Sequence, residues 1–256
     1  MSEQAATTGG RVALVTGATS GIGRACALRL AADGFAVVVG GRNEGRATTV
    51  VHEIVAKGGK ASTALGDVAD PAYGDAAVAT AVADHGRLDV LVNAAGVITR
   101  ADAEGTSDDE WHRVMSTNVD GVFRTSRAAV PAMRAVGGGA IVNISSTCGL
   151  VGNPSLVAYC ASKAAVSNMT RAMALDHAAE GIRVNAVCPG AVDTDMLYSE
   201  RDDSSEEVLA MNLPSIPEGR VPAGEEIAHV VSFLADERSR HVNGANVSVD
   251  GGFTAQ

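Results

Sequence analysis

The sequence predicts a doubly wound α/β fold, with one parallel sheet of about seven strands flanked by helices. Short apolar runs alternate with stretches of helical spacing along the whole chain, and a glycine-rich turn separates the first apolar run from the first helix. Hydrophobic residues make up 46% of the chain and aromatic residues only 3%, which suits a core of small aliphatic side chains between parallel strands and close-packed helices. A length of 256 residues fits one domain spanning residues 1–256.

The strand and helix expectations follow the alternation of the pattern. Strands are expected over 11–16, 35–39, 60–65, 88–92, 139–145, 181–187 and 244–252, and helices over 24–33, 46–58, 70–85, 106–134, 154–180 and 225–236. Asp70 is expected to cap the third of these helices, and Pro131 to kink the long fourth one.

Two stretches fall outside this alternation. Residues 1–10 are small and polar, which predicts a flexible lead-in without a signal sequence. Residues 195–219 carry acids, methionines and two prolines with only brief helical periodicity. We expect this second stretch to form a substrate loop or lid, with a plain surface excursion as the alternative.

Charge and composition exclude several functional classes. A formal charge of −10 argues against nucleic acid as a partner, and no apolar run is long enough to cross a bilayer. The four cysteines (Cys26, Cys148, Cys160 and Cys188) have no CxxC spacing, so reduced thiols in a cytoplasmic protein are expected. The six histidines are scattered, and no metal site is expected.

The glycine-rich turn predicts a nucleotide cofactor. Gly17, Gly21 and Gly23 stand between the first strand and the first helix, with GxxxGxG rather than GxGxxG spacing. Glycines let the backbone approach a pyrophosphate, while the start of the helix supplies free N–H groups and a positive dipole end.

The end of the second strand predicts which cofactor binds. Gly41 stands where an acidic residue would hold the adenosine ribose 2′-hydroxyl, and Arg42 follows, which favours a 2′-phosphate and hence NADP(H) over NAD(H). The alternative is that Arg42 is a solvated loop charge. Asp67 and Val68 end the third strand, at the edge where open parallel sheets bind ligands.

A possible acid/base pair lies in the fifth helical stretch. Tyr159 and Lys163 are four residues apart and share one helix face, so the lysine would lower the pKa of the tyrosine from its usual value of about 10. A tyrosine tuned in this way can transfer a proton near neutral pH, and Ser146 at a strand end could hold a substrate oxygen. An isolated YxxxK pattern on a helix surface is the alternative. Asn118 either satisfies a neighbouring carbonyl or positions a water or side chain, and the pattern leaves both open.

Together these residues resemble the classical short-chain dehydrogenase/reductase family, over nearly the whole chain from Arg11 to Gly252. The motifs that carry the resemblance are Thr16-Gly17-xxx-Gly21-Ile22-Gly23, Asp67-Val68, Asn93-Ala94-Ala95-Gly96, Asn118, Ser146, Tyr159-xxx-Lys163 and Pro189-Gly190. The segment from Asn243 to Gly252 is similar to the β-ketoacyl carrier-protein reductase branch and its alcohol-dehydrogenase and polyketide-ketoreductase relatives.

The resemblance implies a single-domain Rossmann fold and assigns roles to individual residues. Tyr159 would be the general acid/base, Lys163 would lower its pKa and hold the nicotinamide ribose, Ser146 would bind the substrate oxygen, and Asn118 would maintain a water. The cofactor would contact Gly17, Thr19, Ser20, Gly21, Ile22, Gly23, Arg42, Asp67, Val68, Asn93, Ala94, Gly96, Tyr159, Lys163, Pro189, Gly190, Val192 and Thr194. The family also implies a homotetramer whose contacts involve the long helices around Asn118 and Tyr159.

The sequence departs from the family pattern in two places. Ala94 stands where the family often has a second asparagine, which would loosen that turn. Thr19 and Ser20 stand where NADP-preferring members often carry a basic residue, so the cofactor preference rests mainly on Arg42.

The expected function is reversible hydride transfer between NADP(H) and a small-molecule ketone or secondary alcohol, in the direction of a ketoreductase. The alternatives are an NAD-dependent alcohol dehydrogenase that oxidises a hydroxylated metabolite, and a cofactor-binding protein without catalysis. Candidate pocket walls are 97–101, 148–154, 191–192 and 196–217, with Cys148, Asn153 and Met196 as candidate substrate contacts. The identity of the substrate, and whether it is free or carrier-bound, stays open.

Overall fold

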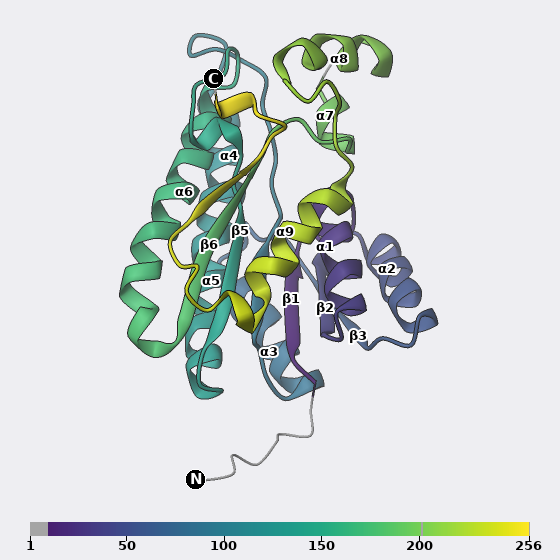
Figure 1. Ribbon diagram of the computed structural model, residues 1–256, viewed down its shortest axis with the longest axis vertical. Helices are drawn as coiled ribbons and strands as arrows, with labels where there is room; N and C mark the ends of the chain where they lie inside the picture. The colour runs from purple at the N-terminus through teal and green to yellow at the C-terminus, as the bar shows by residue number, and fades with distance from the viewer. Residues whose placement is uncertain (1–9, 201, 256) are drawn as a thin grey trace.

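The seven strands of the computed structural model, which describes residues 10–200 and 202–255, form one parallel sheet in the order β3-β2-β1-β4-β5-β6-β7 (Figure 1). The strands are β1 (Val12–Thr16), β2 (Ala36–Gly41), β3 (Ala61–Leu65), β4 (Val90–Asn93), β5 (Gly139–Ile144), β6 (Ile182–Pro189) and β7 (Asn246–Val249). The chain winds outward from β1 in one direction and from β4 in the other, which confirms the predicted doubly wound sheet.

Helices cover both faces of the sheet (Figure 1). They are α1 (Gly21–Ala32), α2 (Glu44–Ala56), α3 (Tyr73–His85), α4 (Asp108–Met115), α5 (Gly121–Ala135), α6 (Val157–His177), α7 (Asp195–Tyr198), α8 (Ser205–Asn212) and α9 (Gly224–Ala235). Side chains of α1, α2 and α9 pack on one face of the sheet, and side chains of α3, α5 and α6 pack on the other. In the described residues, no helix combines the length and apolar character needed to span a membrane.

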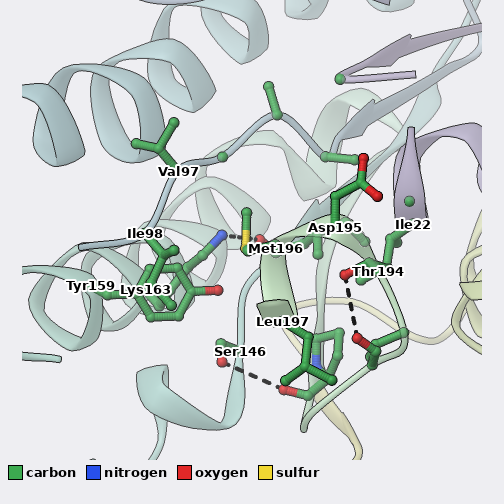
Figure 2. Close-up of a pocket in the computed structure, with 18 of the residues that line it drawn as sticks. Ile22, Val97, Ile98, Ser146, Tyr159, Lys163, Thr194, Asp195, Met196 and Leu197 are labelled. Atoms are coloured by element: carbon green, nitrogen blue, oxygen red, sulfur yellow. Dashed lines mark hydrogen bonds between the residues drawn. The ribbon is translucent and has the colours of Figure 1, made fainter. Parts of the chain in front are cut away.

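The carboxyl ends of the strands meet at one edge of the sheet, and the strand order reverses between β1 and β4. In such sheets the connections diverge at this point and leave a crevice for a ligand. Figure 2 shows this edge, where Ser146 follows β5 and Thr194 and Met196 belong to the segment after β6. The fold therefore gathers the chain segments singled out by the sequence at a single place.

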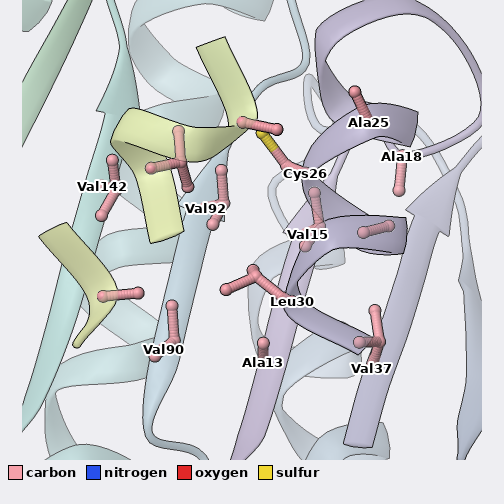
Figure 3. Packing of buried hydrophobic residues seen from close by; sticks show 14 of the residues in the cluster. Ala13, Val15, Ala18, Ala25, Cys26, Leu30, Val37, Val90, Val92 and Val142 are labelled. Atoms are coloured by element: carbon pink, nitrogen blue, oxygen red, sulfur yellow. The ribbon is translucent and has the colours of Figure 1, made fainter. Parts of the chain in front are cut away.

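The core consists of two aliphatic layers, one on each side of the sheet, and Figure 3 shows part of the layer under α1 and α9. Along β1, Ala13 and Val15 pack with the α1 and α9 layer, whereas Val12 and Leu14 pack with the α3 and α5 layer. All four are fully buried, which explains why β1 is apolar from Val12 to Val15 instead of alternating.

The single helix expected over 106–134 is not continuous in the structure. It is divided into α4 and α5 by a π-helical turn, Ser116–Asp120, and Pro131 lies inside α5. The wider turn places the Asn118 side chain in the interior, where it bonds to Val97, so the break serves a buried contact that local sequence does not reveal.

Two helix starts were also misplaced. Asp70 is not an N-cap, because α3 begins at Tyr73 and the Asp70 carboxylate instead accepts a hydrogen bond from Ala72 N in the preceding turn. Helix α6 begins at Val157 rather than near Pro154, because the preceding residues form a turn with Ser155 at a positive φ of 57°.

The segment 195–219 contains two short helices, α7 and α8. Ser204 is the N-cap of α8 and forms a capping box with Glu207. Its role as a lid stays a prediction. The expected N-terminal lead-in, residues 1–10, lies outside the described residues except for Gly10.

A glycine at the contact between α3 and α5 gives a test of this packing. A Cβ on Gly74 would lie 2.8 Å from the backbone oxygen of Arg124, so Gly74→Ala has to push the two helices apart. We expect the free energy of unfolding to fall by about 1–3 kcal/mol in denaturant titration. Gly45→Ala in α2 is the control, since its Cβ would meet nothing closer than 3.6 Å, and it should leave stability unchanged or up to about 1 kcal/mol higher. Equal stability of the two variants would contradict the packing.

Candidate active site

A cleft of about 820 Å³ opens at the carboxyl edge of the sheet. The residues expected at the site that line it are Gly17, Thr19, Ser20, Gly21, Ile22, Gly23, Arg42, Asp67, Val68, Ala94, Gly96, Ser146, Cys148, Asn153, Tyr159, Lys163, Pro189, Gly190, Val192, Thr194 and Met196. Figure 2 shows Tyr159 and Lys163 on one side of the cleft, with Thr194, Met196 and Leu197 of the α7 segment on the other. Only Asn93 and Asn118 of the expected residues do not line it.

The glycine-rich turn forms a tight cradle between β1 and α1. Gly17 has a φ of 65°, and a Cβ on Gly23 would lie 2.2 Å from the backbone oxygen of Gly17, so no other residue fits at position 23. The N-cap residue Ser20 makes no side-chain hydrogen bond to the helix, which leaves the first N–H groups of α1 for a ligand. Gly21 lies beside Thr194, since a Cβ on Gly21 would be 3.2 Å from Thr194 Cγ2.

Arg42 and Asp67 meet at one end of the cleft. The Arg42 guanidinium donates a hydrogen bond to the Asp67 carboxylate over 3.3 Å, and both side chains are partly exposed. A Cβ on Gly41 would lie 2.5 Å from Thr19 Cγ2, so an acidic side chain does not fit where one would bind a ribose. Arg42, with its carboxylate partner, is thus the cation next to Gly41 on the cleft wall.

Ser146, Tyr159 and Lys163 come together deep in the cleft, and all three are buried. Ser146 caps the short turn after β5, with its Oγ accepting a hydrogen bond from Cys148 N over 3.1 Å. Tyr159 and Lys163 lie one turn apart on α6, with Lys163 Nζ 5.5 Å from the centre of the phenol ring. Lys163 Nζ donates a hydrogen bond to Ile144 O over 2.8 Å, which ties α6 to the end of β5.

The pKa of Tyr159 is shifted opposite to the predicted direction. Burial raises this pKa well above its usual value of 10, and the hydrogen bond with Ser146 and the charge of Arg100 offset only part of the rise. Burial also lowers the pKa of Lys163 to about 8. The prediction was wrong because it counted the attraction of the lysine and omitted the cost of removing the phenolate from water, and Lys163 Nζ bonds to Ile144 O.

Asn93 does not reach the cofactor side of the cleft. Its Oδ1 accepts a hydrogen bond from Thr125 Oγ1, and its Nδ2 donates to Ser126 Oγ and to Asn143 Oδ1. Asn143 in turn donates to Thr170 Oγ1 on α6. The side chain at the end of β4 faces the interior of the sheet, so it joins β4, β5, α5 and α6 instead of binding a ligand.

Asn118 is likewise fully buried and bridges two walls of the site. Its Oδ1 accepts from Val97 N over 2.8 Å, and its Nδ2 donates to Val97 O over 2.9 Å and to Ser162 Oγ over 3.0 Å. Both amide hydrogens are therefore used within the protein. Of the two possibilities left open by the sequence, the bond to Val97 O satisfies a neighbouring carbonyl, and the bond to Ser162 Oγ positions a side chain.

The far end of the cleft has an apolar wall. Ile98, Cys148, Leu156 and Tyr159 pack as one buried cluster, with Met196 against it. Leu156 was missed because helix α6 was expected to begin at Pro154, which would have placed this residue within a helix. No local signal could have placed it in the cleft, because its contact is a bridge to Ala101.

Arg100 is a second residue whose role the sequence did not indicate. It lies in the expected wall 97–101 and donates hydrogen bonds to the backbone oxygens of Met196, Leu197 and Ser199. A cation beside the last carbonyl groups of a short helix is electrostatically favourable, so Arg100 holds α7 against the wall of the cleft.

No group of histidine, cysteine, aspartate or glutamate side chains in the described part of the chain could hold a metal ion, and its four cysteines are free.

Comparison with known proteins agrees with this geometry. A family model described as short chain dehydrogenase matches residues 11–205. Cyclohexanol dehydrogenase from Acinetobacter sp. (strain SE19) is 40% identical, covering 96% of each chain, and 3-oxoacyl-[acyl-carrier-protein] reductase from Staphylococcus aureus is 40% identical, covering 94% of this chain and 96% of its own. The crystal structure of a single-residue variant of actinorhodin polyketide ketoreductase with NADPH superposes with a TM-score of 0.91 at 38% identity, over 96% of this chain and 98% of that chain.

The buried Lys163 predicts a pH-dependent stability. Its pKa is about 8 in the folded protein, against 10.5 for an exposed lysine, so the unfolded chain binds more protons above pH 8 and stability rises with pH there. Relative to Lys163→Met, the wild type should gain about 1 kcal/mol in free energy of unfolding between pH 7 and pH 9. Lys57→Met removes an exposed lysine and should show no such divergence in the same denaturant titrations. A constant difference for Lys163→Met would show that this ammonium is not desolvated.

Proposed function

The chain belongs to the short-chain dehydrogenase/reductase family and is an NAD(P)-dependent oxidoreductase, and from this premise we propose that it transfers hydride reversibly between NADP(H) and a ketone or secondary alcohol, as a ketoreductase. The convergence of Ser146, Tyr159 and Lys163 in the same cleft as the glycine cradle carries this proposal. We assign all of this chemistry to one domain covering residues 1–256.

The residues present fit a nicotinamide dinucleotide. A cradle in which a Cβ on Gly17 or Gly23 would collide with backbone supports a pyrophosphate against the start of α1, and Arg42 supports a 2′-phosphate. The solved ketoreductase with a TM-score of 0.91 is a complex with NADPH. When bound, the nicotinamide supplies or accepts the hydride.

Tyr159 holds the proton that the reaction needs. Because burial raises its pKa, the phenol is protonated at neutral pH and donates its proton to the substrate oxygen as negative charge develops there. Ser146 Oγ donates a hydrogen bond to the same oxygen. Lys163, with a pKa of about 8, is mostly charged at pH 7 and stabilises the phenolate left behind. A protonated Tyr159 favours the reductive direction.

The two asparagines act in this proposal as positioning residues. Asn118 fixes Val97, next to the apolar wall, and Asn93 fixes the end of β4. Ala94 and Gly96, in the turn that follows Asn93, provide the cofactor contacts expected of that turn.

A homotetramer and a cytoplasmic location belong to the same proposal. Apolar side chains on three helices support subunit contacts, since Trp111, Phe123 and Leu175 are exposed on α4, α5 and α6. The four free cysteines support a reducing compartment.

A second candidate function is NAD-dependent oxidation of a hydroxylated metabolite. One observation favours it: Arg42 already has the Asp67 carboxylate as a partner, and Thr19 and Ser20 add no positive charge to the glycine turn. The relative from Acinetobacter is named for the oxidation of an alcohol, cyclohexanol.

Removing the phenol oxygen tests the mechanism. Tyr159→Phe should lower kcat for ketone reduction by about 10²–10⁴-fold, because the proton donor is lost, while the Kd for NADPH stays nearly unchanged. Tyr198→Phe is the matched control, since its hydroxyl bonds to Asp193 on the surface, and it should retain turnover. Retained turnover in Tyr159→Phe would remove this residue from the mechanism.

Fluorescence titration with NADPH and NADH tests the role of Arg42. Arg42→Ala should weaken NADPH binding by about 10–100-fold through loss of a charge-assisted contact, with little change for NADH. Arg29→Ala, which removes an arginine paired with Asp33 on α1, should alter neither. If the wild type binds NADH as tightly as NADPH, the second candidate function replaces the first.

A further inference from the structure

Acidic side chains concentrate at the segment that closes the substrate end of the cleft. Residues 199–208 hold five acids and one arginine in the sequence, and Glu200, Asp202 and Asp203 line the cleft. Glu200 lies beside the apolar wall, because its partner Arg113, at 3.2 Å, also donates to Ile98 O. Asp202 and Asp203 are exposed and make no hydrogen bond or ion pair with any residue in 10–200 or 204–255.

The positive charges of the cleft already have partners. In the described part of the chain, the cations that line it are Arg42, Arg100 and Lys163. Arg42 pairs with Asp67, Arg100 donates to three backbone oxygens at the end of α7, and Lys163 donates to Ile144 O. Arg42 is thus paired with a carboxylate, whereas Arg100 and Lys163 keep their charges and are held in place by backbone oxygens.

The surface around Tyr159 is apolar. Ile98, Cys148 and Leu156 pack around the phenol, and Met196 lies against them from α7. A substrate whose carbonyl reaches Tyr159 therefore places its body against aliphatic and thiol groups, with carboxylates at the entrance.

We propose that the substrate is an uncharged, compact ketone or secondary alcohol with an apolar body, and that Glu200, Asp202 and Asp203 are specificity residues that reject anionic substrates. This inference rests on the proposed function and narrows it. Like charges raise the free energy of an approaching anion, and the effect extends over a Debye length of about 8 Å at physiological salt. Ketones attached to a phosphopantetheine arm, which carries a phosphodiester anion, fall in the rejected class, and a neutral cyclic ketone falls in the accepted one.

A matched pair of ketones tests this inference. The anion 4-oxocyclohexanecarboxylate and its neutral methyl ester share one skeleton, and kcat/KM for each is measured with NADPH at pH 7.5. The wild type should prefer the ester by about tenfold or more. The variant Glu200→Gln/Asp202→Asn/Asp203→Asn should raise the carboxylate-to-ester ratio of kcat/KM about tenfold, and 0.5 M salt should raise the wild-type ratio in the same direction.

The control variant removes the same number of negative charges as the triple variant, but at sites outside the cleft. Asp75→Asn/Asp84→Asn/Asp176→Asn removes three exposed acids of α3 and α6 and should leave the ratio unchanged. The double variant Asp202→Asn/Asp203→Asn keeps the Glu200–Arg113 ion pair and should show part of the effect even if the triple variant folds poorly.

A wild-type ratio near one, or a ratio that the triple and double variants do not change, would overturn the inference while the proposed function stands. Turnover of neither compound would also overturn it. In that case a wider panel of ketones and alcohols decides separately whether the proposed function fails.

Discussion

The hydrogen bond from Lys163 Nζ to Ile144 O is the contact on which the site depends. It places a buried ammonium at the carboxyl end of β5, and Ser145 Oγ returns a hydrogen bond to Lys163 O, so α6 is fixed to that strand by two contacts. Tyr159 lies one turn earlier on α6 and Ser146 directly follows Ser145. Fixing Lys163 therefore also sets the distance between the Tyr159 and Ser146 hydroxyl groups.

Burial of this lysine and of Tyr159 opposes stability and serves chemistry. Burial keeps the Tyr159 phenol protonated at neutral pH, whereas it disfavours the Lys163 ammonium, whose pKa of about 8 leaves it mostly charged at pH 7. The asparagine bonds around them supply the rigidity that such a site requires. Asn93 and Asn143 connect β4, β5 and α6, and Asn118 uses a π-helical turn to reach Val97.

The two ends of the cleft differ in their electrostatic character. The glycine-cradle end has Arg42 and the open N–H groups of α1, which suit a phosphate-rich cofactor, whereas the other end has Glu200, Asp202 and Asp203 near an apolar wall. Helix α7 is attached by cations on two other parts of the chain, because Arg100 bonds to its carbonyls and Arg46 of α2 lies 3.7 Å from Asp195. Helix α7 is thus tied both to α2 and to the segment after β4.

Sequence alone determined the sheet, the glycine turn and the pairing of Tyr159 with Lys163, because strand and helix periodicity and the steric needs of glycine are local properties. It also placed Ser146 at a strand end on the ligand edge. Only the tertiary structure decided the direction of the Tyr159 pKa, the inward orientation of Asn93 and Asn118, the place of Leu156 in the cleft and the hydrogen bonds from Arg100 to α7. Each of these depends on burial or on a partner far away in sequence, such as the 44 residues between Asn118 and Ser162, and desolvation is set by the packed neighbours rather than by the local chain.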